Sequence, residues 1–121
     1  MGRFAGVNVS RFLYFVRSKK MVVITKSVAE KRLGDVPQEK QFWCHDGRYL
    51  KNLRELGDVL EQMTDETFRY HVNASRNDFG NWVRDVIGDD KLSRDLQKST
   101  GKAQATKSVA DRITFLKKKT E

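Results

Sequence analysis

Four residues near the middle of the chain have side chains that can bind a metal ion: Cys44, His45, Asp46 and His71. A structural zinc site needs four such ligands in a tetrahedral arrangement, and they usually occur in C-x2-C or H-x3-H pairs. Neither spacing occurs in this sequence. If residues 44–46 are extended, Cys44 and Asp46 face one way and His45 faces the other. The sequence therefore predicts a buried cysteine and ordinary histidines, and no metal site.

The sequence supports a catalytic site no better than it supports a metal site. Catalysis by Cys44 and His71 would need a thiol of low pKa beside the base and an oxyanion site, and the sequence indicates neither. No glycine motif of the kind that holds nucleotide phosphates is present. The carboxylates that could form an acid–base pair or a magnesium site mostly stand at expected helix starts, where capping explains them: Asp65, Glu66, Asp78, Asp85, Asp89 and Asp90. We therefore expect a non-enzymatic protein without a cofactor.

The elements that would position these residues are mostly short helices. The clearest contains Leu53, Leu56, Leu60 and Met63, which recur on one face at helical spacing. A capping box that starts at Ser75 is expected to open another helix, which Gly88 then ends. Further helices are predicted at residues 25–32, 64–73, 89–98 and 102–117.

These patterns predict an all-α fold, a compact domain of four to five short helices with a basic N-terminal arm. We assign residues 1–37 to a basic arm or linker that need not be fully ordered, 38–117 to the helical domain and 118–121 to a basic tail. Phe42 and Trp43 form one short extended segment without a partner strand, so both are expected to anchor the core. The predicted core consists of Phe42, Trp43, Leu53, Leu56, Leu60, Phe68, Phe79, Trp82, Val83, Val86, Val109 and Ile113.

The formal net charge of +8 is carried by the two ends of the chain. Residues 1–40 hold nine Lys/Arg and three Asp/Glu, residues 41–92 hold seven and ten, and residues 93–121 hold eight and three. Clusters of Lys and Arg supply the sequence-independent part of nucleic-acid affinity. The charge pattern thus favours a small folded module held on a polyanion by its two ends.

The chain carries no sign of secretion. Its most apolar N-terminal run, Phe12 to Val16, has five residues, too few for a signal peptide or a membrane span. The single cysteine, Cys44, excludes an internal disulfide and suits a reducing compartment. We expect a cytoplasmic location, with a membrane as the least favoured partner.

The middle of the chain resembles a known family. The strings FWCHDGRYLKNLREL (42–56), DETFRYHVN (65–73) and RNDFGNWVRDVIGD (76–89) are similar to a family of small, mainly archaeal helical domains of uncharacterised function. The likeness covers about residues 40–116, and its most specific part is the last string. Because such domains occur alone and attached to larger proteins, the resemblance implies an interaction module.

We therefore favour a non-enzymatic nucleic-acid-associated protein that binds DNA or structured RNA mainly through phosphate. The alternative is a protein–protein adaptor that uses its acidic, aromatic centre, and a small enzyme is the least supported. No helix combines Arg, Asn and Gln as a recognition helix does, so sequence-specific binding is not indicated. The candidate phosphate contacts are Arg11, Arg17, Lys19, Lys20, Lys26, Lys31, Arg32, Lys98, Lys102, Lys107, Lys117, Lys118 and Lys119.

Overall fold

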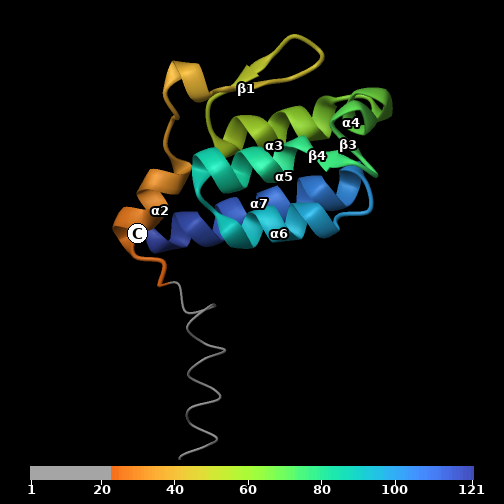
Figure 1. The fold of residues 1–121 in the computed structure, drawn as a ribbon. Coiled ribbons are helices and arrows are strands. Elements are labelled where there is room, and N and C mark those ends of the chain that lie inside the picture. Colours follow the sequence, from red (N-terminus) through yellow and green to blue (C-terminus); the bar gives the residue numbers. More distant parts are fainter. Residues whose placement is uncertain (1–22) are drawn as a thin grey trace, which may run out of the picture.

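The structure is a computed structural model that describes residues 23–121 (Figure 1). Over these residues the chain forms six α-helices, a 3₁₀ turn, a π-helical turn and two small hairpins, which confirms the predicted all-α class. The sixth helix is α2, in the segment that the sequence assigns to the arm. In chain order the elements are α2 (Lys26–Leu33), η1 (Gln38–Lys40), β1 (Phe42–Trp43), β2 (Tyr49–Leu50), α3 (Leu53–Gln62), α4 (Asp65–His71), β3 (Val72–Asn73), β4 (Arg76–Asn77), α5 (Asp78–Trp82), η2 (Val83–Ile87), α6 (Asp90–Lys98) and α7 (Lys102–Lys119).

The helix starts follow from local hydrogen bonds. Five helices are preceded by a residue whose side-chain oxygen accepts a hydrogen bond from the backbone N–H three residues later. These residues are Thr25, Asn52, Thr64, Asn77 and Asp89. Such caps satisfy donors that have no partner within the helix. Five of the six helices therefore begin where the sequence supplies a short polar side chain.

One expected cap is wrong. The sequence points to Ser75 as the start of a capping box, but the hydroxyl of Ser75 donates to the side chain of Asn73 in the turn between β3 and β4. Asn77 caps α5 in its place, and its amide also donates to the carbonyl of Leu96 at 2.9 Å. The hairpin uses the residues that precede Asn77, so the helix begins two residues later than the capping box implies.

The β1–β2 hairpin corrects the expectation for Trp43. Phe42 pairs with Leu50 and Trp43 pairs with Tyr49, around a turn in which Gly47 has a φ of +100°. Successive side chains on a strand point to opposite faces. Phe42 and Leu50 are therefore buried, whereas Trp43 is 48% exposed. The prediction that Trp43 anchors the core is wrong, because the segment has a partner strand that places it on the outer face.

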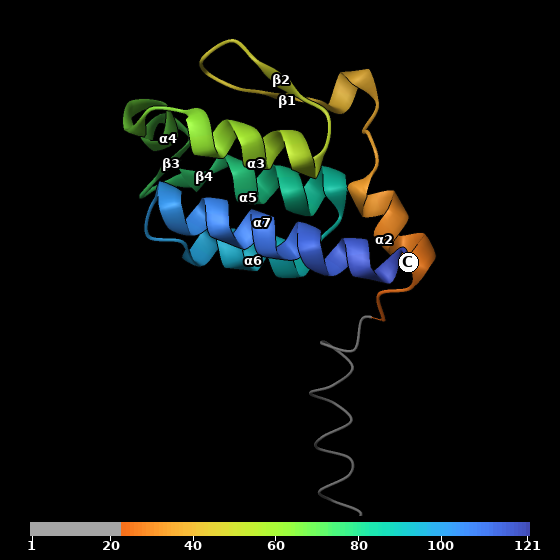
Figure 2. The ribbon, with the colours of Figure 1, turned by 180° about the vertical axis from the view of Figure 1, so that it is seen from behind.

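Helix α7 packs against more of the other α-helices than any other element does. This helix lies against α2, α3 and α6, and α5 packs on α6. In both ribbon views α3, α5, α6 and α7 run side by side, with α2 at one end and α4 at the other (Figures 1 and 2). The C-terminal end of α7 lies beside α2 in each view. Two segments that are far apart in the sequence thus meet at one end of the domain.

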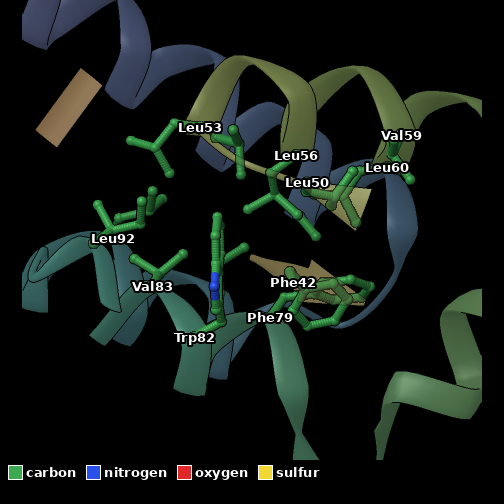
Figure 3. Close-up of a cluster of buried hydrophobic side chains, with 14 of the residues drawn as sticks. Phe42, Leu50, Leu53, Leu56, Val59, Leu60, Phe79, Trp82, Val83 and Leu92 are labelled. Atoms are coloured by element: carbon green, nitrogen blue, oxygen red, sulfur yellow. The ribbon is translucent and has the colours of Figure 1, made fainter. Parts of the chain in front are cut away.

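The core lies among α3, the α5–η2 segment, α6 and α7. Side chains of α3, among them Leu53 and Leu56, point toward Phe79, Trp82 and Val83 across this space (Figure 3). The indole Nε1 of Trp82 donates to the carbonyl of Lys40 at 2.8 Å, so the ring also holds η1. The predicted core is confirmed for Phe42, Leu53, Leu56, Leu60, Phe68, Phe79, Trp82, Val83 and Val109, whereas Val86 and Ile113 are partly buried.

Residues 24–36 also pack with the helical domain. Ala29 on α2 is fully buried, and Ile24, Leu33 and Val36 contact the core from the N-terminal side. The N–H of Val36 donates to the carbonyl of Lys51 at 2.8 Å, which ties this segment to the start of α3.

Replacing Trp82 with alanine is expected to lower the free energy of unfolding by about 3 to 5 kcal/mol, because a buried ring and its hydrogen bond are lost. Trp43→Ala removes the same atoms from the exposed face of β1 and is expected to cost about 1 kcal/mol or less. Urea unfolding followed by circular dichroism compares the two variants. A parent-like midpoint for Trp82→Ala would contradict the burial of Trp82.

Candidate functional site

A buried carboxylate joins three helices at the α2 end of the domain. Asp89 is fully buried and caps α6, with Oδ1 3.0 Å from the N–H of Leu92. The guanidinium of Arg112 on α7 donates to both of its oxygens, at 2.7 and 3.1 Å. Arg32 on α2 lies 3.7 Å from Oδ2. Two arginines therefore share one buried carboxylate, and the side chain of Arg32 is only 15% exposed.

This arrangement changes the expected role of Arg32. The sequence makes it a phosphate contact, but its side chain is 15% exposed and is held by Asp89. The sequence also does not reveal the Asp89–Arg112 pair. One signal was available: Ala105, Val109, Arg112 and Leu116 recur at helical spacing and are all buried. An arginine on an apolar helix face predicts a buried acidic partner, since an unpaired charge there is too costly.

A cavity of about 570 Å³ opens between α2, α6 and α7 beside these arginines. Lys91 pairs with Asp95 in its wall at 2.7 Å, and Asp111 pairs with Lys107 at 2.7 Å. Among the described residues, Arg94 has no carboxylate within ion-pair distance. The walls thus carry mostly paired charges, and the lining residues are Ile24, Arg32, Asp90, Lys91, Arg94, Asp95, Ser108, Asp111, Arg112 and Phe115.

Exposed lysines lie on α2 and at the end of α7, two of the helices that line this cavity. Three of them form the last turn of α7, and the Nζ of Lys119 lies 5.4 Å from the centre of the Phe115 ring. The neighbouring α2 carries two more (Figure 2). All five are exposed, and none makes an ion pair among the described residues. We define the basic end as Lys26, Lys31, Lys117, Lys118 and Lys119.

The other sequence candidates lie elsewhere. Lys98 ends α6 and Lys102 begins α7, about 25 Å along that helix from Lys119. The Nζ of Lys102 donates to the carbonyl of Glu61 at 3.4 Å, and Lys107 pairs with Asp111 in the middle of α7. Among the described residues, five of the predicted lysine contacts therefore lie on α2 and the end of α7, and Lys98, Lys102 and Lys107 lie away from them. Arg11, Arg17, Lys19 and Lys20 lie outside the described residues.

The Cys44 and His71 pair does not form a nucleophile and base. Cys44 is fully buried, and burial raises the pKa of its thiol. The Nε2 of His71 accepts a hydrogen bond from the N–H of His45 at 3.0 Å, so Nδ1 carries the proton and donates to Asp78, also at 3.0 Å. Both ring nitrogens are occupied by structural contacts. Across residues 23–121 no three His, Cys, Asp or Glu side chains are grouped closely enough to hold a metal ion.

Comparison with known proteins gives no relative. No family model, curated protein or solved structure matches the chain. None of the helices described combines the length and the apolar character that crossing a membrane requires.

Asp89→Asn is expected to cost about 3 to 5 kcal/mol of unfolding free energy, because it keeps a capping oxygen but leaves the buried Arg112 without its counter-charge. Asp111→Asn, which breaks an exposed ion pair on α7, should change stability by less than about 1 kcal/mol. Urea unfolding of both variants tests this. Similar costs for the two would show that Asp89 is not the critical carboxylate.

The Cys44 thiol should react with iodoacetamide at least about tenfold more slowly in the native protein than in urea, since it is buried and its pKa is raised. Mass spectrometry over a time course measures the alkylated fraction. Equal rates in both conditions would place the thiol at the surface.

Proposed function

We propose that this protein is a non-enzymatic nucleic-acid-associated protein whose basic end contacts the phosphates of DNA or structured RNA. The observation that carries the proposal is the meeting of α2 and the end of α7, which gathers five exposed lysines from distant parts of the sequence. Lysines on a common surface neutralise adjacent phosphates and release counterions.

Helix stability alone does not account for these lysines. Cations in the last turn of a helix stabilise it, which gives Lys31, Lys117, Lys118 and Lys119 a structural use. Lys26 occupies the first position of α2, the end at which a cation is unfavourable. A lysine at this position supports a role in binding.

The sequence before α2 extends the same charge. Residues 1–22 hold five Lys/Arg and no Asp/Glu, and Lys19 and Lys20 stand shortly before α2. Ile24 lines the cavity, so the described chain begins at the basic end of the domain. This continuity favours one basic surface that includes α2 and the end of α7. Because lysine and phosphate make point-charge contacts, binding should depend weakly on base sequence.

The triple variant Lys117→Gln, Lys118→Gln, Lys119→Gln is expected to reduce the slope of log affinity against log salt by roughly 2 to 3 units on duplex DNA. The loss should be similar on unrelated sequences. Fluorescence anisotropy with labelled duplexes over a salt series measures the slope.

The matched control neutralises Lys40, Lys51 and Arg54, which are exposed and lie outside α2 and α7. It removes the same charge and should leave the slope within about 1 unit of the parent. An equal loss in both variants would mean that net charge, not the basic end, drives binding. An unchanged slope in the α7 variant would favour the adaptor function instead.

A further inference from the structure

A second surface, away from the basic end, consists of four exposed rings on the β1–β2 hairpin and α4, three of which are linked by ring contacts. Trp43 and Tyr49 are directly opposite on the outer face of the β1–β2 hairpin, 48% and 64% exposed. The ring of His45 meets Trp43 edge to face at 6.1 Å and stacks on Tyr70 of α4 at 3.8 Å. We call Trp43, His45, Tyr49 and Tyr70 the aromatic surface.

Contacts beneath the aromatic surface hold it in one arrangement. Phe42 and Leu50, the strand neighbours of Trp43 and Tyr49, are buried in the core. The guanidinium of Arg76 lies 4.8 Å from the centre of the Tyr70 ring. The buried His71 accepts the N–H of His45 and fixes the turn against α4. Because Trp43, His45 and Tyr70 are already held by these contacts, a partner that binds them costs little side-chain entropy at these three rings.

The exposed rings have no role in the core, so their exposure requires another explanation. Tyr and Trp contribute large contact areas in protein interfaces and are enriched among the residues that dominate binding. A contiguous exposed apolar patch commonly marks such a site. Trp43 and Tyr49 are the most accessible rings of this surface and are its expected anchors.

The charges around the aromatic surface disfavour a nucleic acid. Arg48 donates to Asp46 at 2.6 Å, and this hydrogen bond lowers the pKa of Asp46 to about 2. Arg76 is paired with Asp78 at 3.3 Å. Arg48 and Arg76 are therefore neutralised, whereas Lys51, Arg54 and Arg69 are exposed and make no ion pair among the described residues. Residues 42–71 hold six Asp/Glu against four Lys/Arg, so the net charge of this segment is negative.

Unpaired carboxylates border the hairpin. Arg48 donates to the side chain of Gln62, which brings the hairpin turn against the end of α3. Glu61, Asp65 and Glu66 follow there, all exposed and, among the described residues, without an ion pair. Lys102 binds the backbone carbonyl of Glu61, not a carboxylate, and Arg69 on α4 makes no ion pair with Asp65 or Glu66. Ordered aromatic rings beside unpaired carboxylates suit cationic side chains.

We propose that the aromatic surface docks a protein segment rich in Lys or Arg, with Trp43 and Tyr49 covered by the stems and charged heads of its side chains. The carboxylates at the end of α3 and the start of α4 pair with the remaining cations. This inference does not depend on the proposed function of the basic end, because the two surfaces share no residue.

The test uses the full chain and three labelled peptides of equal leucine content, whose polar positions are all Lys, all Gln or all Glu. Fluorescence anisotropy should give the tightest binding for the Lys peptide and none for the Glu peptide. Trp43→Ala and Tyr49→Ala should each weaken binding of the Lys peptide about tenfold or more. The double variant Glu61→Gln, Glu66→Gln should weaken it several-fold and reduce its salt dependence.

Phe115→Ala is the matched control, because Phe115 is another exposed aromatic residue but lies on α7. It should leave the peptide affinity unchanged, as should the Lys117, Lys118 and Lys119 variant. Tyr49→Ala keeps the proposal testable if Trp43→Ala perturbs the hairpin, since Tyr49 is the more exposed residue of the pair.

Three kinds of result would overturn the proposal. The first is binding that depends neither on peptide charge nor on the two aromatic anchors, seen as equal binding of the three peptides or as full affinity in both aromatic variants. The second is binding of an oligothymidylate that is lost in Trp43→Ala, which would make the surface a base-stacking site. The third is self-association in sedimentation velocity that depends on Trp43, which would identify a second copy of the chain as the occupant.

Discussion

The arrangement of α2, α6 and α7 depends on one fully buried carboxylate. Asp89 accepts a hydrogen bond from a backbone N–H at the start of α6 and two from Arg112 on α7. It also forms an ion pair with Arg32 on α2. Each partner offsets part of the cost of removing a carboxylate from water, and loss of Arg112 would remove the two hydrogen bonds that compensate most of the charge. The three helices are therefore held together by a polar contact with defined geometry, in addition to apolar packing.

That contact also decides which positive charges remain for binding. Arg112 is buried and Arg32 is half-buried, so neither is displayed as an ordinary surface cation. By holding α2 against α7, the same contact brings Lys26 and Lys31 near the lysines that end α7. The basic end is thus a product of packing. A linear count of charges identifies its members but gives no reason for them to meet.

A second polar anchor organises the opposite side of the domain. The ring of His71 is buried between Asp78 and the backbone of His45, and it packs against Phe42 and Phe79. It connects α4, the start of α5 and the hairpin turn, which places His45 over Tyr70. The domain therefore has two surfaces of different chemistry, and each is positioned by a buried polar group.

Local features of the sequence were sufficient to predict most of the helices. The apolar spacing of Leu53, Leu56 and Leu60 and the cap at Thr64 predict α3 and the start of α4, and Gly88 marks the end of η2 with a φ of +85°. These signals act within a few residues, so they are visible in the chain itself.

Contacts between residues that are distant in the sequence determined which aromatic and charged side chains are buried. Trp43 is exposed because Tyr49 pairs with it across the hairpin, and a single strand gives no sign of which face its partner will bury. Arg32 and Arg112 are held inside because they meet Asp89, which is 57 and 23 residues away in the chain. Residue type and spacing determined most of the helices, the caps other than that of α5, and the supply of charge. Only tertiary contacts determined which charges are neutralised and which rings are exposed, because burial and pairing depend on neighbours that are distant in sequence.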